Sequence, residues 1–317
     1  MNRRDLLATT SSLLGLDPAY LAAKEKLTAG KALGPLPKRR YGRSKEKLSI
    51  IGFGGMVVKD VTPKEAANFV AEAVDRGVNY FDVAPFYGNA QRRLGPALKP
   101  YRQKCFLACK TLERDAAGAA KELKESLKLL QTDHFDLYQL HAFTDVEEVE
   151  QAFGPRGAMK TILKAKEDGK IRYIGFSAHS EETAHAALDR FDFDSILFPL
   201  SFSTWIGANF GPSVYKRAKK TGMGIIALKA MAHQQWPKGK KHRWKKTFYE
   251  PFDEIDKAAL GLRFTLHLPV TAMFPPGHWE LFQMALGLAQ VGALTPLSSK
   301  ERKIIKQIAK NSVPIFP

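Results

Sequence analysis

Short apolar runs alternate with longer segments of helical period along most of the chain, from about Leu48 onward. The apolar runs are rich in β-branched and aromatic residues, which is typical of strands. Eight of them are predicted as strands, at residues 49–53, 80–84, 105–110, 135–141, 173–177, 195–200, 224–229 and 270–274. Strands that alternate with helices predict a parallel sheet, and eight strands are the number that closes a (β/α)8 TIM barrel.

The segments between the strands repeat apolar residues at spacings of three and four, as amphipathic helices do. One such face consists of Ala66, Phe69, Val70, Ala73 and Val74, and another of Ala120, Leu123, Leu127 and Leu130. Thr62-Pro63 is a start signal for the first helix, and Gly77 is a stop signal after it. We expect these helices to pack on the outside of the sheet.

A six-stranded doubly wound sheet is the alternative fold for the same alternation. It predicts a Gly-x-Gly-x-x-Gly turn between the first strand and a helix that follows directly. The first strand instead runs into Gly52-Phe53-Gly54-Gly55, which lacks the third glycine, and no helix is predicted before about Pro63. The barrel is therefore the favoured fold.

The N-terminal segment falls outside the barrel pattern. Arg3-Arg4 precedes a mildly apolar run from Leu6 to Leu16, which is too short to span a bilayer, and Leu21-Ala22-Ala23 is an approximate cleavage site. This start resembles a twin-arginine export signal and predicts a periplasmic protein; the alternative is a flexible arm on a cytoplasmic protein. We assign residues 1–35 to this segment and residues 36–317 to a single barrel domain.

A long insertion at residues 231–253 follows the seventh predicted strand. It contains a lysine-rich stretch, 238–246, and the interleaved aromatic residues Trp236, Trp244, Phe248 and Tyr249. In a barrel this insertion emerges on the face where the strands end, which is the face that carries sites. It is either a flexible loop tip or a lid that contacts an anionic cofactor or substrate.

The composition is basic. The 49 Lys and Arg residues exceed the 32 Asp and Glu residues by 17, a balance that attracts nucleic acid, anionic lipid or phosphorylated small molecules. No nucleic-acid motif accompanies the charge, so we expect a basic solvated surface and no nucleic-acid partner. No stretch is apolar for long enough to insert stably in a membrane, and the eight histidines lack metal-ligand spacing.

Four residues with complementary chemistry occur where the second, third and fourth predicted strands end. Asp82 and Tyr87 follow the second strand, Lys110 ends the third, and His141 ends the fourth. Because all strands of a parallel barrel end on one face, these side chains are expected to converge. Reduction of a carbonyl needs a proton donor at its oxygen, and a tyrosine can serve if a nearby cation lowers its pKa. We predict Tyr87 as the acid, Lys110 as that cation, Asp82 as the partner that orients Lys110, and His141 as the group that polarises the carbonyl.

The spacing of these residues resembles that of the aldo-keto reductases. The pattern consists of Asp82-x-Ala-x-x-Tyr87-Gly88, Leu94-Gly95, Lys110, Leu140-His141, Phe176-Ser177 and Phe274-Pro275-Pro276-Gly277. The resemblance runs from about Arg40 to Ile308. It implies a monomeric barrel that binds NADPH across its mouth and reduces a small aldehyde or ketone, with Asp82, Tyr87, Lys110 and His141 as its catalytic group.

The resemblance also implies cofactor contacts, at Gly54, Ser177, Lys229, Gly277 and Trp279. Lys229 stands where most of the family has Ser, a substitution found in some bacterial branches, and it could reach a cofactor phosphate. Trp279 could stack on the adenine.

Several cofactor positions depart from the family pattern. Ala178 and Pro199 replace an expected Asn and Gln. After Gly277, the family's arginine clamp for the adenosine 2′-phosphate is missing, and Glu280 would repel a phosphate. NADPH is the expected cofactor, with NADH as the alternative. A second function class is a nicotinamide-binding or redox-sensing barrel that has lost effective turnover.

Overall fold

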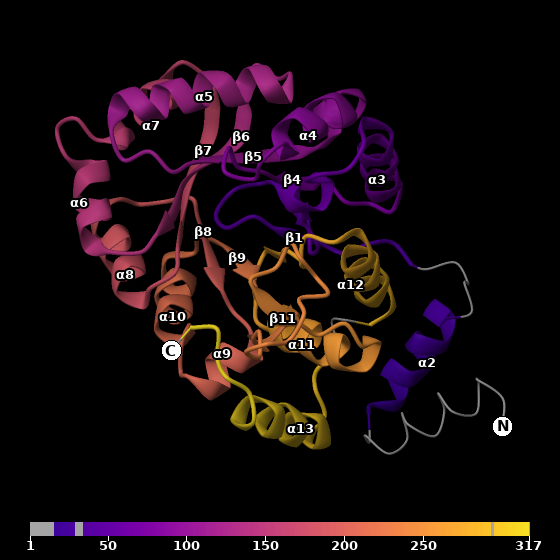
Figure 1. Cartoon of the computed structure of the whole chain (residues 1–317). Coiled ribbons are helices and arrows are strands. Elements are labelled where there is room, and N and C mark those ends of the chain that lie inside the picture. The colour runs from indigo at the N-terminus through magenta and orange to yellow at the C-terminus, as the bar shows by residue number, and fades with distance from the viewer. Residues whose placement is uncertain (1–15, 29–33, 293–294, 317) are drawn as a thin grey trace.

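The predicted barrel is present. The computed structural model describes residues 16–28, 34–292 and 295–316. Within them, eight parallel strands form one sheet in the order β12-β9-β8-β7-β6-β5-β4-β3. The sheet closes because Ile51, just before β3, forms a parallel bridge with Met273 of β12. The strands curl around a common axis and the helices surround them, as a (β/α)8 barrel requires (Figure 1).

Each of the eight predicted runs overlaps one barrel strand, although the first run shares only Phe53 with its strand. The strands are β3 (Phe53–Gly54), β4 (Tyr80–Asp82), β5 (Phe106–Thr111), β6 (Phe135–Phe143), β7 (Ile171–Ala178), β8 (Ser195–Pro199), β9 (Gly224–Leu228) and β12 (Ala272–Met273). The first strand is shorter than predicted, because Ser49 pairs in a separate antiparallel hairpin of β1 (Lys38–Arg40) and β2 (Lys47–Ser49).

The helices occupy the segments between the strands. They are α2 (Pro18–Thr28), η1 (Gly55–Val58), α3 (Pro63–Asp75), α4 (Ala90–Leu98), η2 (Lys99–Lys104), α5 (Ala116–Leu130), α6 (Val146–Phe153), α7 (Ala158–Glu167), α8 (Glu181–Arg190), α9 (Phe202–Gly207), α10 (Pro212–Thr221), α11 (Ile255–His267), α12 (Trp279–Val291) and α13 (Ser299–Lys310). Helix α3 begins as predicted: the Thr62 hydroxyl accepts from the Glu65 amide and the Glu65 carboxylate accepts from the Thr62 amide. Its apolar face is buried at Ala66, Val70 and Ala73.

The inside of the barrel changes character from one end to the other. Side chains alternate between inside and outside along each strand. The cluster that fills the inside is Tyr41, Leu48, Tyr80, Phe106, Ala108, Leu137, Leu197, Ile226, Ala272 and Phe274. Two residues further along β4, β5 and β6, the same inward stripe carries Asp82, Lys110 and Gln139, all buried. The barrel is therefore apolar below and polar just beneath the ends of its strands.

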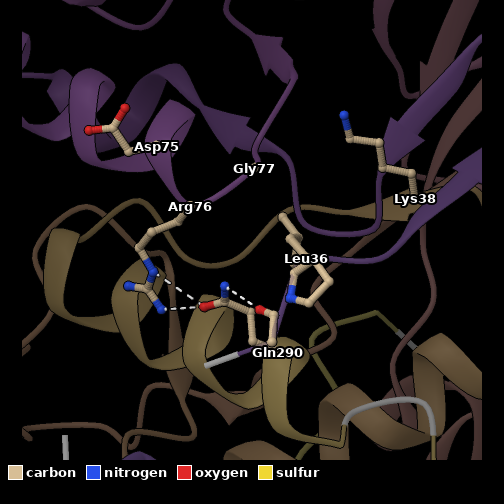
Figure 2. Close-up of a pocket in the computed structure, with 8 residues that line it drawn as sticks. Leu36, Lys38, Asp75, Arg76, Gly77 and Gln290 are labelled. Atoms are coloured by element: carbon tan, nitrogen blue, oxygen red, sulfur yellow. Dashed lines mark hydrogen bonds between the residues drawn. The ribbon is translucent and has the colours of Figure 1, made fainter. Parts of the chain in front are cut away.

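The N-terminal end of the barrel is closed by the β1–β2 hairpin. The ring of Tyr41, which lies between these strands, packs against Phe106 and Tyr173, with ring centroids 5.2 and 5.4 Å apart. A pocket near this end is lined by Leu36, Arg76 and Gln290, among others, and the Arg76 guanidinium donates to the Gln290 amide oxygen (Figure 2). It contains none of the predicted site residues, because Asp82, Lys110 and His141 lie near the opposite, C-terminal ends of the strands.

The N-terminal segment divides into two parts. Residues 1–15, with Arg3-Arg4, lie outside the described residues, so the export signal stays a prediction. Residues 16–28 are not a flexible arm: they include α2, which lies beside α12 (Figure 1), and the side chain of Tyr20 is buried. The Tyr20 hydroxyl and the Lys24 ammonium both donate to Asp256 of α11, at 2.9 and 2.8 Å. Among the described residues, no helix is long and apolar enough to cross a membrane.

We expect Asp256→Ala to loosen α2 from the barrel, because it removes the carboxylate that both Tyr20 and Lys24 contact. The loss should be about 1–3 kcal/mol of unfolding free energy, the cost of partly buried hydrogen bonds to a charged group. Hydrogen exchange of residues 16–28 should accelerate while that of β5 and β6 stays slow. Unchanged exchange in α2 would show that apolar packing alone holds the helix.

Candidate active site

A buried ion pair lies where β4 and β5 end. The Lys110 ammonium donates to Asp82 Oδ1 and, at 3.4 Å, to the carbonyl oxygen of Val83. The other carboxylate oxygen of Asp82 accepts from Gln139 Nε2 at 2.9 Å. The side chain of Lys110 is wholly buried. The predicted role of Asp82 as the partner that orients Lys110 is consistent with these contacts.

Burial and pairing act against each other on the pKa values of this pair. Burial raises the pKa of Asp82, and the Lys110 cation lowers it again without cancelling the rise. Burial is the largest single influence on Lys110 and lowers its pKa, but the charge and hydrogen bond of Asp82, together with Tyr87 and Cys109, outweigh that effect and the net pKa is raised. Lys110 is therefore held as a cation at neutral pH, which is the state that the predicted site requires.

Tyr87 is brought to the same place by a turn after β4. The Tyr87 amide donates to the Ala84 carbonyl, and the Tyr87 carbonyl accepts from the Ala90 amide at the start of α4. The Lys110 nitrogen lies 5.3 Å from the centre of the Tyr87 ring. Burial raises the pKa of Tyr87 above its usual value, and Lys110 is the neighbour that lowers it most. The predicted effect of Lys110 has the right sign, yet desolvation outweighs it and the resting phenol stays protonated.

His141 completes the group. Its ring lies edge-on to Tyr87, with centroids 5.9 Å apart at 82°. Burial, with help from Lys110, lowers the pKa of His141 to about 2, so its imidazole is neutral at physiological pH. Its Nδ1 is buried and has no hydrogen-bond partner in the described part of the chain. A neutral imidazole with a free ring nitrogen is suited to contact a ligand oxygen.

Three residues without a predicted role also belong to this site. Gln139 holds the second oxygen of Asp82. Its period-two spacing from His141 could have indicated it, because both face inward on β6. Arg114 donates to the His141 carbonyl oxygen at 2.7 Å. His179 follows β7 and stacks on Phe316, a contact between distant segments that no sequence pattern indicates.

The predicted cofactor residues all lie at the same mouth, but they differ in surroundings. Gly54 pairs with Asp82 across β3 and β4. The Ser177 hydroxyl accepts from the Ala142 amide at 2.7 Å and so supports the backbone next to His141. Gly277 is required for packing, because a Cβ there would lie 2.4 Å from Met56 Cβ. Trp279 stacks on Phe69 at 4.2 Å and 7°, so that face of its ring is occupied by the protein rather than free for adenine.

The basic insertion is an ordered hairpin. Strands β10 (Ala232–Gln235) and β11 (Tyr249–Pro251) pair in antiparallel fashion. The loop between them reaches the rim after β12 and β3, the next two strands around the barrel from β9, where the Lys246 amide donates to His278 Nε2 at 2.9 Å and its ammonium donates to the Val57 carbonyl at 3.1 Å. The arrangement agrees with a cover over the mouth better than with a flexible loop tip.

We expect the buried ion pair to show strong coupling. Lys110→Met should cost about 3–5 kcal/mol of unfolding free energy, because it leaves the Asp82 carboxylate buried without its cation. Asp82→Asn should also destabilise, and the double variant should cost less than the two single changes together. Denaturant titrations at neutral pH would measure all three. Additive losses would mean that the two charges do not depend on each other.

The low pKa of His141 predicts a pH dependence of stability. The unfolded state takes up a proton near pH 6.5 while the folded state keeps the ring neutral down to about pH 2. Stability from this group is present above pH 6.5 and is lost as the pH falls, by up to about 1.4 kcal/mol per pH unit. His141→Gln should therefore flatten the decline in unfolding free energy between pH 6.5 and pH 5. An equally steep decline in the variant would contradict the assignment.

Comparison with known proteins places this geometry in a family. The model of the Aldo/keto reductase family matches residues 50–312. L-galactose dehydrogenase of Arabidopsis thaliana is 27% identical over 213 residues, 61% of this chain and 65% of that protein. Aldo-keto reductase YhdN of Bacillus subtilis is 36% identical over 143 residues, 41% of each chain. The matched segments thus span less than two thirds of these relatives.

Solved structures agree in fold over nearly the whole barrel. The holo form of aldo-keto reductase AKR11C1 from Bacillus halodurans has a TM-score of 0.69 at 24% identity and covers 88% of this chain and 98% of its own. An aldo/keto reductase from Klebsiella pneumoniae, solved with NADP and acetate, has a TM-score of 0.65 at 19% identity, covering 88% and 96%. From the match of the family model to most of its length, together with this fold, the chain belongs to the aldo/keto reductase family.

Proposed function

We propose that this protein reduces a small aldehyde or ketone by hydride transfer from NADPH, with Tyr87 as the proton donor. The observation that carries the proposal is the meeting of Tyr87, the Lys110–Asp82 ion pair and a neutral His141 at one mouth of the barrel. Family membership and the oxidoreductase names of the relatives support it.

The proton is held and released at the Tyr87 hydroxyl. Burial keeps this phenol protonated at rest, so a proton is available when negative charge develops on the carbonyl oxygen. As the proton leaves, the phenolate that forms is stabilised by the neighbouring Lys110 cation, which lies in a site with little water to screen it. Asp82 and Gln139 hold Lys110 in place for this role.

His141 orients the carbonyl. As a neutral ring it can donate one N–H to the carbonyl oxygen without releasing its own proton. The edge-on arrangement with Tyr87 lets one oxygen atom contact both groups. Arg114 supports this position through the His141 backbone carbonyl.

The residues at the mouth fit a nicotinamide dinucleotide. When bound, the reduced nicotinamide supplies the hydride. The Ser177 hydroxyl accepts one hydrogen bond and keeps its own hydrogen for a ligand acceptor. Helix α12 begins with no side-chain cap, so its first amides can bind a phosphate, while Gly277 lets the backbone before this helix pack closely against Met56. NADPH is the proposed cofactor, which the Klebsiella pneumoniae neighbour supports, and NADH is the alternative because Glu280 faces solvent where an arginine clamp is expected.

A second candidate function is a nicotinamide-binding or redox-sensing barrel with little turnover. It is favoured by the cofactor side of the mouth, where Trp279 is engaged by Phe69 and the clamp residues are missing. The two functions share cofactor binding and differ in whether the Tyr87 hydroxyl matters.

Tyr87→Phe separates them. It removes the proton donor but keeps the ring, and should lower kcat for reduction of aldehydes by roughly 100- to 10,000-fold. The rate is measured by the loss of reduced-nicotinamide absorbance, and Kd values for NADPH and NADH by quenching of protein fluorescence. Those Kd values should stay near wild type. Full activity in Tyr87→Phe would reject the proposed mechanism, and a wild type that binds NADPH without turnover would favour the second function.

A further inference from the structure

One ammonium group at the mouth has no counter-charge. Lys229 directly follows β9, and its side chain makes no hydrogen bond or ion pair with any residue in 16–28, 34–292 or 295–316. Its nitrogen lies instead 4.3 Å from the centre of the Phe248 ring and 5.0 Å from that of Tyr249, both from the β10–β11 hairpin. Ring faces attract a cation but do not accept its three hydrogen bonds.

The surroundings of Lys229 favour an anion. Burial lowers the pKa of Lys229 to about 8, and no carboxylate opposes that effect. Its charge in turn lowers the pKa values of His141 and His179, so it lies near both rings. Within this part of the mouth the charged neighbours are cations, since Lys110 and Arg114 also lower the pKa of His141. The two carboxylates that contact these cations are already paired, Asp82 with Lys110 and Glu148 with Arg114.

The backbone at Lys229 is strained as well. Its φ is +66°, a left-handed conformation that costs a residue with a Cβ about 1–2 kcal/mol. The Lys229 carbonyl accepts from the Ala232 amide at 2.7 Å, so the turn into the hairpin holds this conformation. A strained backbone that presents an unpaired cation beside a catalytic histidine is characteristic of a ligand-binding position.

We propose that Lys229 is the specificity residue of the substrate site and binds a carboxylate or phosphate group on the carbonyl compound. The inference rests on the proposed function and deepens it: the reacting carbonyl lies between Tyr87 and His141, and the anionic end of the substrate lies toward Lys229 and His179. This assignment departs from the cofactor contact that the family resemblance implies for Lys229, in which the ammonium would bind a phosphate of the dinucleotide. Binding measurements on Lys229→Met distinguish these two ligands.

The rim of the mouth indicates the rest of the substrate. Phe86, Leu112 and Phe248 are exposed large apolar side chains, and all three follow the ends of barrel strands or lie in the hairpin above them. Exposed apolar side chains beside a site favour an apolar substrate body. An aromatic aldehyde with a carboxylate at its far end therefore suits both features.

The kinetic test compares para-carboxybenzaldehyde with para-methylbenzaldehyde, which differ in charge at similar size. Wild type should prefer the carboxylate in kcat/KM. Lys229→Met keeps the side-chain length and the backbone strain, and should lower kcat/KM for the carboxylate roughly 10- to 100-fold, mainly through KM, while changing the methyl compound less than about threefold. Lys229→Arg should retain part of the preference.

Lys124→Met, which removes an exposed charge on the outer helix α5, is the matched control. An equal loss for both aldehydes in Lys229→Met would overturn the proposal.

Binding measurements decide between the two anion sources without requiring turnover. Calorimetric titration of para-carboxybenzyl alcohol into NADP⁺-loaded protein should give a Kd that Lys229→Met raises roughly 10- to 100-fold, with the Kd of NADP⁺ itself unchanged. A raised Kd for NADP⁺ with unchanged alcohol binding would assign Lys229 to the cofactor and overturn the proposal. If wild type reduces neither aldehyde, the proposed function fails, while this titration still decides the role of Lys229.

A stability measurement excludes a merely structural role. Replacing an unpaired, partly buried cation with an apolar side chain of similar length should leave the Tm unchanged or raise it. A Tm lowered by several degrees in Lys229→Met, together with unchanged binding of the alcohol, would show that the ammonium stabilises the hairpin and binds no substrate.

Discussion

The desolvation of one ion pair governs the chemistry of this barrel. Lys110 and Asp82 lie on the inward stripe of β5 and β4, directly above a layer of aromatic and aliphatic side chains. Burying two charges removes them from water, which costs free energy. Their mutual attraction offsets this cost only if the ion pair keeps its geometry and the second carboxylate oxygen also accepts a hydrogen bond. Gln139 satisfies it from the next strand. The same contacts that join β4, β5 and β6 also fix the position of the Lys110 charge, which lowers the pKa values of Tyr87 and His141. The fold and the site therefore depend on the same contacts.

Much of this arrangement follows from local rules. Alternation of apolar runs with helical segments predicts eight strands, and the common direction of parallel strands brings Asp82, Lys110 and His141 together although they are far apart in the chain. Tyr87 was predicted at the same mouth because it follows the second strand, whereas the turn that presents it is seen only in the structure. These features follow from the local hydrophobic periodicity and from the alternation of strands and helices, and short stretches of sequence show both.

Other features depend on what distant segments do to one another. The net pKa of Tyr87 is the balance between Lys110 and desolvation, and the extent of burial is set by the whole mouth. Trp279 was predicted beside a ligand, yet the apolar face of α3 supplies Phe69 as its partner. The first strand is shorter than its apolar run because part of that run pairs in the hairpin that closes the barrel below. The docking of α2 depends on Asp256, which nothing near Tyr20 in sequence indicates.

The closure of the barrel has a consequence for its motions. Strands β3 and β12 have two residues each, and they are joined by the Ile51–Met273 bridge, with Gly52 and Met273 as the backbone donors. By contrast, strands β6 and β7, elsewhere in the barrel, share a much longer ladder. A junction with few hydrogen bonds needs the least free energy to open. We therefore expect the junction between β3 and β12 to be the first part of the barrel to open locally. It runs directly below Gly54 and Gly277, so the proposed dinucleotide side of the mouth borders the junction with few hydrogen bonds, and Asp82 of the ion pair lies only one strand away from it, opposite Gly54.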